Sequence, residues 1–189
     1  MTTTYSDELI EAQQRTIRFN LACPEIPTPC GRLLTADKHQ QFPYAVREAV
    51  GELSEKDIVG QCISIHWRLQ VTLEKFFAAP ILYTIGYVHT PPSDMFKQTE
   101  PELLQRLHTG LNGAQVQFHA WLTLPSMEII DISLPTSFAV IKGLTEGHGG
   151  VIASHAEELK HGLRYHPMLL GEDYLRKIGA LIEFPIFGI

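Results

Sequence analysis

Three side chains of this sequence, Cys62, His119 and Asp131, have the chemical types that cysteine-dependent catalysis uses. Such catalysis needs a thiolate, a base that keeps the thiol ionised, and a third group that orients the base. Cys62 directly follows Gly60 and Gln61, and it begins a helix if the next segment is helical. The unpaired N–H groups of a helix N-terminus and a neighbouring imidazolium stabilise a thiolate. Cys62 is therefore the candidate nucleophile.

The other two cysteines, Cys23 and Cys30, flank a proline-rich segment that is expected to form an extended loop until Gly31. An odd number of cysteines leaves at least one thiol unpaired unless it bonds to another molecule, which suits a reducing compartment. The N-terminal residues carry no secretory signal pattern, and no apolar stretch approaches the ~20 residues that span a bilayer. We expect a cytoplasmic protein, or one exported without a cleavable signal peptide, with no membrane partner.

The candidate base and its orienting acid are expected on one β-hairpin. Residues 115–124 alternate between apolar and polar side chains, and residues 128–133 have the composition of a returning strand. With a three-residue turn between them, Trp121 pairs with Asp131, and His119 becomes the diagonal neighbour of Asp131 on the same face, roughly 7–8 Å away at Cα. A two-residue turn would send Asp131 to the opposite face. The orienting role of Asp131 thus depends on one register.

The segment that follows Cys62 fits two periodicities. Apolar residues alternate strictly with polar ones from Ile63 to Leu73, which is typical of a strand. A second set of apolar residues has helical spacing: Ile65, Leu69, Leu73, Phe76 and Phe77. Because no Gly or Pro interrupts the run from Cys62 to Ala79, and strands rarely continue that long, its length slightly favours a helix.

The sequence contains GQC at 60–62, then HAWLTL at 119–124 and IIDIS at 129–133. In this order the three pieces resemble the transglutaminase-like cysteine superfamily, a papain-like fold that includes transglutaminases, cysteine peptidases and bacterial protein deamidases. ILYTIGYV at 81–88 resembles the strand that commonly lies between the cysteine helix and the histidine strand. The resemblance covers roughly residues 55–135 and implies a helix that begins at the cysteine.

Carried onto this chain, the resemblance implies that Cys62 is the nucleophile, His119 the base and acid, and Asp131 the residue that holds the tautomer of His119. It implies hydrolysis of an amide bond in a protein or peptide substrate, without a cofactor. The backbone N–H of Cys62 and the side-chain amide of Gln61 are the candidate oxyanion donors. Nothing in the sequence marks an acyl-acceptor site, so transglutamination itself is not indicated.

Each of these residues also has a plainer interpretation. Cys62 could be a small buried apolar residue, and His119 and Asp131 could be ordinary polar groups of a sheet. His66 lies four residues after Cys62 on the same helical face and is the rival base, although nothing nearby in sequence is placed to orient it. Four later histidines fit neither the HExxH nor a paired CxxC pattern, so we expect no metal site. They are His148, His155, His161 and His166.

The rest of the chain predicts helices first and antiparallel strands after them, an α+β pattern. Ser6 is the expected N-cap of a helix over residues 7–21, with Ile10 and Ile17 on its apolar stripe. The further expected elements are a helix from Pro43 to about Leu53, a strand over 81–89, a helix opened by a capping box at 99–102, a loop over 143–150, a short helix capped by Ser154 and ended by Gly162, and a helix over 174–178.

Composition and charge limit the classes of function. The chain has 189 residues, of which 44% are apolar, enough for one globular domain with a continuous core. We divide it into a helical N-terminal part (1–54), a catalytic core (55–135) and a C-terminal part (136–189). With 15 basic and 21 acidic residues and a formal net charge of −6, it lacks the surplus of Lys and Arg that nucleic-acid binding needs.

The sequence therefore predicts a papain-like, transglutaminase-like α+β fold whose nucleophile begins a core helix packed on an antiparallel sheet. The predicted function is a cysteine-dependent amide hydrolase, either an amidase, a protein deamidase or a peptidase. A non-catalytic binding module on the same fold is the alternative, because a fold does not determine a function. An acetyl-transferring enzyme with the same triad order is a third interpretation, although the composition offers no obvious site for a nucleotide-bearing acyl donor.

Overall fold

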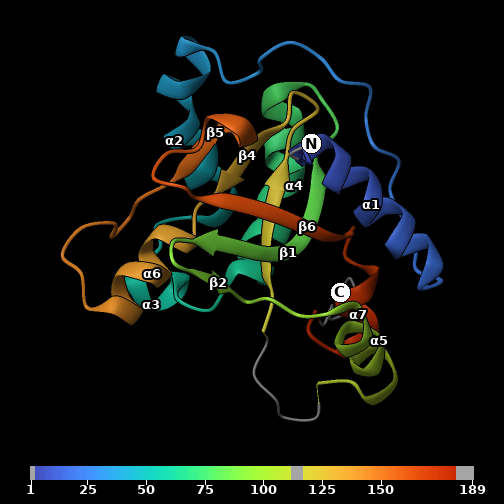
Figure 1. Cartoon of the computed structure of the whole chain (residues 1–189). Coiled ribbons are helices and arrows are strands. Elements are labelled where there is room, and N and C mark those ends of the chain that lie inside the picture. Colours follow the sequence, from blue (N-terminus) through green and yellow to red (C-terminus); the bar gives the residue numbers. More distant parts are fainter. Residues whose placement is uncertain (1–2, 112–116, 182–189) are drawn as a thin grey trace, which may run out of the picture.

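The computed structural model describes residues 3–111 and 117–181 (Figure 1). In these residues an antiparallel sheet packs against helices, so the fold is α+β as expected. The helices are α1 (Tyr5–Arg18), α2 (Ala36–Val50), α3 (Glu55–Ile58), α4 (Cys62–Phe77), α5 (Glu100–Thr109), α6 (Leu134–Lys142) and α7 (Asp173–Ile178), with a short 3-10 helix, η1 (Ala156–Glu158). The strands are β1 (Leu82–Thr90), β2 (Ser93–Met95), β3 (His119–Thr123), β4 (Glu128–Asp131), β5 (Ile152–His155) and β6 (Arg164–Leu170).

β1 is the central strand of the sheet, because it pairs with β2, β3 and β6. Gly86 pairs with His119 of β3 and with Pro167 of β6, so these two strands lie on opposite edges of β1. Val88 pairs with Met95 of β2 and also with β6, so β2 lies on the same edge as β3. The end of β2 therefore meets the start of β3 along one edge of β1, and β4 and β5 extend the sheet beyond β3.

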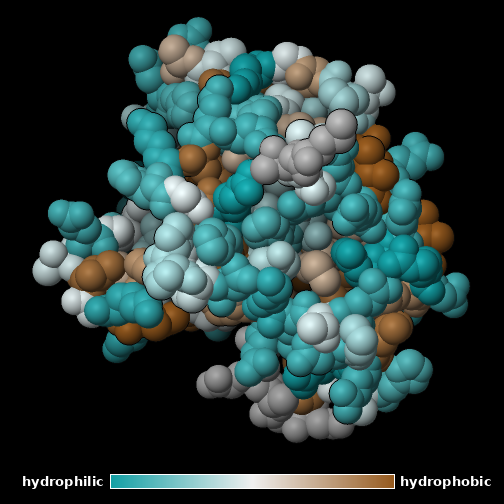
Figure 2. Space-filling view, in the orientation of Figure 1, coloured by the Kyte–Doolittle hydropathy of each residue, from teal (hydrophilic) through white to brown (hydrophobic). Residues whose placement is uncertain are grey.

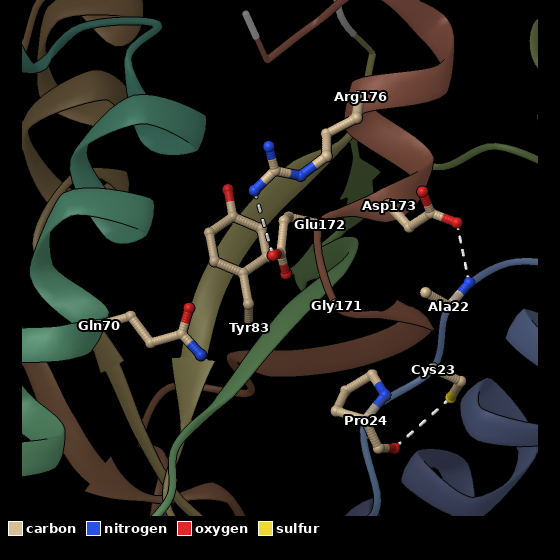
Figure 3. A pocket seen from close by; sticks show the side chains of 9 residues that line it. All are labelled: Ala22, Cys23, Pro24, Gln70, Tyr83, Gly171, Glu172, Asp173 and Arg176. Carbon is tan, nitrogen blue, oxygen red and sulfur yellow. Dashed lines mark hydrogen bonds and ion pairs between the residues drawn. The ribbon is translucent and has the colours of Figure 1, made fainter. Parts of the chain in front are cut away.

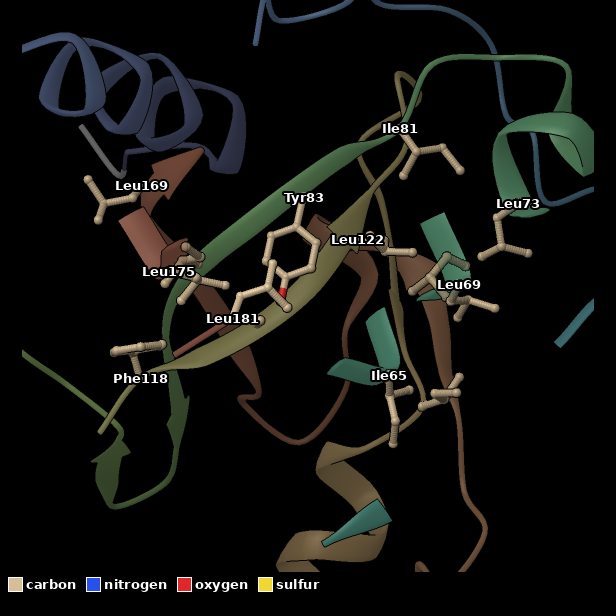
Figure 4. Packing of buried hydrophobic residues seen from close by; sticks show 14 of the residues in the cluster. Ile65, Leu69, Leu73, Ile81, Tyr83, Phe118, Leu122, Leu169, Leu175 and Leu181 are labelled. Carbon is tan, nitrogen blue, oxygen red and sulfur yellow. The ribbon is translucent and has the colours of Figure 1, made fainter. Parts of the chain in front are cut away.

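The segment with two periodicities is a helix. Ile65, Leu69 and Leu73 of α4 are almost completely buried in the core between this helix and the sheet (Figure 4). Val71, which belongs only to the alternating pattern, is 57% exposed. The helical stripe thus buries its members against β3, as an amphipathic helix does. α4 ends where Ala78 takes the left-handed conformation.

The hairpin of β3 and β4 has the register that a three-residue turn predicts. Leu122 pairs with Ile130, and the Leu124 N–H donates to the carbonyl of Glu128 at 2.9 Å. The two candidate polar residues of the hairpin therefore share a face, as predicted. Of the strand expected over 115–124, residues 115 and 116 lie outside the described residues.

The prediction for α1 was wrong in its start and in its buried face. Thr4, and not Ser6, is the N-cap, and its side chain exchanges hydrogen bonds with Asp7 in a capping box. α1 packs on β6, and in this position Ile10 and Ile17 are exposed, by 46% and 61%. The buried residues of α1 have helical spacing and form a different stripe from the expected one: Tyr5, Leu9, Ala12 and Thr16.

α2 starts before the expected position at Pro43. Thr35 is its N-cap, and the Thr35 hydroxyl accepts a hydrogen bond from the Lys38 N–H. Pro43 lies inside the helix, where it removes one backbone hydrogen bond. Packing of α2 on α4 and the cap at Thr35 outweigh that loss. The helix ends at Gly51, which has a φ of 75°.

The short helix expected after Ser154 was also wrong. Ser154 lies within β5, where it pairs with Ile129 of β4. The 3-10 helix η1 begins only after this strand, and the His155 side chain accepts the Glu157 N–H at its start. Pairing with a distant strand therefore overrode the local capping pattern.

β6 was not predicted, because Pro167 interrupts its sequence. This residue pairs with Gly86 at the point where the register of β1 and β6 shifts, and proline is accepted at such an irregularity. The strand expected over 81–89, the helix with a capping box at 99–102, the loop over 143–150 and the helix over 174–178 are confirmed.

The face of the molecule seen in Figure 2 is mostly hydrophilic, with apolar side chains gathered over α1 and α6. The exposed large apolar residues of these two helices are Ile10, Ile17, Val140 and Ile141. Among the described helices, none combines the length and the apolar character that crossing a bilayer requires.

Candidate functional site

His119 and Asp131 form a buried hydrogen-bonded pair across the hairpin. The Nε2–H of His119 donates to Oδ2 of Asp131 at 2.6 Å, and the side chains are 2% and 0% exposed. The same carboxylate oxygen accepts the hydroxyl of Tyr165, from β6, at 2.7 Å. Adjacent strands thus bring the two predicted residues together at a diagonal position.

The second oxygen of Asp131 accepts hydrogen bonds from the start of α6. Oδ1 takes the N–H of Ser133 at 2.9 Å, its hydroxyl at 3.1 Å, and the N–H of Leu134 at 3.0 Å. Burial alone would raise the pKa of Asp131, but the charge and the hydrogen bond of His119, together with the Ser133 N–H, more than offset burial and hold this pKa well below its usual range. Asp131 is therefore a buried anion with well-satisfied oxygens.

His119 is the positively charged partner of this anion. Burial lowers the pKa of His119. The charges of Asp131 and Cys62 and the hydrogen bonds to both side chains have the larger, opposite effect and raise this pKa to about 10. Because Nε2 is bound to Asp131, Nδ1 is the ring nitrogen left for the sulfur of Cys62. The ring thus interacts with the carboxylate of Asp131 through Nε2 and with the side chain of Cys62.

Aromatic side chains enclose the His119 ring. Phe96 is stacked on it at a centroid distance of 5.5 Å and an angle of 20°, and Trp121 lies at 6.1 Å and 24°. Phe96 directly follows β2 and has a φ of 66°, a left-handed conformation that is unusual for a bulky residue. Because β2 ends beside the start of β3, this turn carries the Phe96 ring over His119. The enclosure keeps water away from the bond between His119 and Asp131.

The sequence analysis did not find Phe96 or Tyr165. Tyr165 belongs to β6, the strand that was not predicted, and it contacts Asp131 only because β6 pairs with β1. Phe96 reaches His119 through the end-to-end order of β2 and β3. Neither contact has a local sequence signal, because both depend on the pairing of distant strands.

Cys62 is the first residue of α4, as predicted, and it is partly exposed. No side chain caps this helix, and its first turn contains no acidic residue. By contrast, α1, α2 and α5 are each capped by a threonine side chain. The first N–H groups of α4 are therefore left without a side-chain acceptor, and they point toward the end of the helix where the thiol lies.

Gln61, the residue before the thiol, is the N-cap position of α4 and is exposed. Its side-chain oxygen accepts the hydroxyl of Ser64 at 3.1 Å. Within residues 3–111 and 117–181, its amide nitrogen has no hydrogen-bond partner. An amide held in this way has a donor group available, but its role as an oxyanion donor stays a prediction.

His66, the rival base, has both ring nitrogens engaged with the backbone. Nδ1 lies 2.8 Å from the carbonyl oxygen of Cys62, and Nε2 lies 3.2 Å from the backbone nitrogen of Ile132. Burial lowers the pKa of His66, the charge of Asp131 raises it, and the charge of His119 lowers it again, so that this pKa lies below its ordinary value. A fully buried neutral ring with two backbone partners leaves no nitrogen for the thiol, so the geometry favours His119 as the base.

The other cysteines lie elsewhere, and all three are free thiols. Cys23 is partly buried, its Sγ lies 3.5 Å from the carbonyl oxygen of Pro24, and burial raises its pKa. Cys30 is exposed. In the part of the chain that the structure describes, no cluster of His, Cys, Asp and Glu side chains could hold a metal ion.

A cavity of about 340 Å³ is lined by Tyr83 of β1 and by Gln70 of α4 (Figure 3). The buried Tyr83 hydroxyl donates to the carbonyl oxygen of Ile63 at 2.9 Å. Burial raises the pKa of Tyr83 well above its ordinary value, and Cys62 and Glu172 add to this. Glu172 itself pairs with Arg176 at 3.3 Å. Tyr83 thus ties β1 to the turn that carries the thiol.

Comparison with known proteins found no match among protein-family models, curated proteins or solved structures. Family membership is therefore not shown by comparison. The arrangement of Cys62, His119 and Asp131 is the main ground on which a function can be argued.

Proposed function

We propose that this chain is a cysteine-dependent hydrolase of amide bonds with a papain-like arrangement of Cys62, His119 and Asp131. The observation that carries the proposal is the buried 2.6 Å hydrogen bond between His119 and Asp131, together with the effect of Cys62, which also raises the pKa of His119. The three side chains come from α4, β3 and β4, so only the folded chain brings them together. A thiol, a base and an orienting carboxylate are the parts that such chemistry needs.

In the acylation step, the thiolate of Cys62 attacks the carbonyl carbon of the amide, and the electron pair of the C=O bond moves onto oxygen. The uncapped N–H of Cys62 and the amide of Gln61 are the donors next to this oxygen. When the C–N bond breaks, Nδ1 of the His119 imidazolium gives its proton to the leaving nitrogen. The products are a free amine and a thioester on Cys62.

In the deacylation step, the neutral His119 takes a proton from water, and the resulting hydroxide attacks the thioester carbon. The C–S bond breaks, and the carboxylic acid leaves while Cys62 returns to the thiolate. Asp131 accepts the Nε2–H of His119 throughout, so the same ring nitrogen always faces the sulfur. The overall reaction consumes one water and needs no cofactor.

The first prediction concerns the thiol. In the native protein near neutral pH, iodoacetamide should label Cys62 about tenfold or more faster than Cys30, because an ordinary thiol is only a few per cent thiolate at pH 7. Peptide mass spectrometry of a time course measures both rates. Cys30 is the control, since it is more exposed than Cys62. Faster labelling of Cys30 would contradict an activated thiolate.

The substrate class is tested by intact mass. A candidate protein partner is incubated with wild-type chain and with the Cys62→Ala variant. Conversion of a side-chain amide to an acid identifies a deamidase, and fragments identify a peptidase; both changes should be absent with Cys62→Ala.

A non-catalytic binding module is the second candidate. It is favoured by the Gln61 side chain, whose oxygen is held by Ser64, and by the almost complete enclosure of His119. A module would bind its partner equally well as wild-type and as Cys62→Ala, and it would leave the mass of the partner unchanged.

A further inference from the structure

His66 is a buried histidine that the proposed reaction does not use. It lies one helical turn after Cys62 on α4 and is 0% exposed. Its ring is nearly perpendicular to that of His119, with centroids 6.4 Å apart. A buried imidazole is stable only when both nitrogens have hydrogen-bond partners, so these partners determine its tautomer.

The tautomer of His66 follows from the two backbone groups that it contacts. The carbonyl of Cys62, 2.8 Å from Nδ1, can only accept, so Nδ1 carries the proton. The N–H of Ile132, 3.2 Å from Nε2, can only donate, so Nε2 carries none. Oδ1 of Asp131 also lies 3.4 Å from Nε2. Asp131 would attract a proton on Nε2, but that proton would point at the hydrogen of the Ile132 N–H, which is unfavourable.

The two backbone groups belong to the two halves of the candidate site. The Cys62 carbonyl lies in the first turn of α4, and Ile132 directly follows Asp131 at the end of β4. One side chain thus joins the residue that bears the thiol to the residue next to the carboxylate. A displacement of about 1 Å between reacting groups can reduce a rate about 100-fold, so this link bears directly on catalysis.

We propose that His66, in its Nδ1–H tautomer, is a positioning residue that holds the start of α4 against the end of β4 and thereby sets the distance between Cys62 and His119. The catalytic consequence rests on the proposed function, whereas the tautomer and the backbone link do not. His66 therefore acts through the backbone and touches no substrate atom.

The variants separate the two hydrogen bonds of the ring. His66→Phe keeps the ring and loses both bonds. His66→Asn places a donor near the position of Nδ1 and so keeps the bond to Cys62, but it is too short to reach Ile132. His108→Phe is the matched control, because Nδ1 of His108 makes the same bond to a carbonyl four residues earlier, at 2.8 Å, on an exposed face of α5.

We expect His66→Phe to slow alkylation of Cys62 at neutral pH roughly tenfold and to move its pH profile toward higher pH, because the thiol no longer lies beside the imidazolium. His66→Asn should fall between wild type and His66→Phe, and His108→Phe should match wild type. A change in stability alone would not move the pH profile of a protein that stays folded. An unchanged profile in folded His66→Phe would overturn the positioning role.

Two measurements on the protein test the link without any activity. Nitrogen NMR of the wild-type chain should find His66 neutral with its proton on Nδ1, and this needs no variant to fold. Hydrogen exchange of the Ile132 amide should be slow in wild type and faster in His66→Phe. The Nε2–H tautomer, or a rapidly exchanging Ile132 amide in wild type, would refute the link. If both results agree with the link while Cys62 is unreactive, the proposed function alone fails.

Discussion

At the scale of single residues, the charge of Asp131 decides the state of His119. Asp131→Asn keeps an oxygen for the N–H groups of Ser133 and Leu134 but removes the charge that raises the pKa of His119. The pKa of His119 should therefore fall, since only Cys62 then opposes the effect of burial. Alkylation of Cys62 at neutral pH should slow by about tenfold or more, because fewer rings are imidazolium.

The measurement is an NMR titration of His119 combined with the alkylation rate. Asp94→Asn is a matched control, since Asp94 accepts a hydrogen bond from His89 at 2.7 Å in a partly exposed pair. That variant should change neither His119 nor Cys62. If His119 titrates at the same pH in Asp131→Asn as in wild type, the account of the pair is wrong.

The residues of the candidate triad could be predicted, but their surroundings could not. Cys62, His119 and Asp131 were found because their chemical types and the hairpin register are readable from local sequence. Phe96 and Tyr165 were not, because each reaches the site through strand pairs that join distant segments. Polar residues that carry chemistry are few, whereas aromatic residues that enclose a site resemble any other core residue.

At the scale of elements, Tyr5 attaches α1 to the sheet by a buried polar contact. Its hydroxyl accepts the Trp121 Nε1–H at 2.9 Å and is hydrogen-bonded to Thr123 at 2.7 Å. Tyr5→Phe leaves the Trp121 donor without a partner and should lower the free energy of unfolding by about 1–3 kcal/mol. Urea unfolding measures this. Tyr44→Phe is the control, because Tyr44 is 73% exposed and should change stability little.

A Tyr5→Phe protein as stable as wild type would show that water or a local shift satisfies the Trp121 donor. It would also mean that apolar packing on β6, and not the Tyr5 hydroxyl, holds α1 on the sheet.

Several elements with a strong local signal were predicted, whereas β6, which forms by pairing with a distant strand, was not. The capping box of α5 and the three-residue turn of the hairpin each act within a few residues. β6 contains Pro167, and only its place opposite Gly86 at a register shift makes a strand possible there. The sequence of α4 fits a strand almost as well as a helix, because it carries both an alternating and a helical apolar pattern. Burial of the helical stripe against β3 favours the helix.

At the scale of the whole molecule, the sheet brings together groups that the chain keeps far apart. β1 lies between β3, which carries His119, and β6, which carries Tyr165. β4 continues the sheet with Asp131, and α4 packs across β3 with Cys62 at its first residue. Composition predicted a core of ordinary size. It did not predict the order of the strands around β1, which positions the residues of the candidate site.

This arrangement predicts how the stability of the molecule depends on pH. The pKa of His119 is raised in the folded state to about 10, so its stabilising contribution is complete below its unfolded value of about 6.5 and is lost as the pH rises toward 10. The pKa of Asp131 is lowered, so its contribution is present above its unfolded value of about 3.9 and is lost as the pH falls further. Both contributions are complete only between about pH 4 and 6.5.

The difference in unfolding free energy between wild type and Asp131→Asn should therefore be largest between about pH 4 and 6.5 and should shrink on either side. Urea unfolding over a pH series measures it. Glu55→Gln removes the partner of His148, an exposed pair with a 2.7 Å contact, and should give little change at any pH because solvent screens such pairs. A difference that stays constant with pH would mean that Asp131 supports the fold through its hydrogen bonds to α6 and not through its charge.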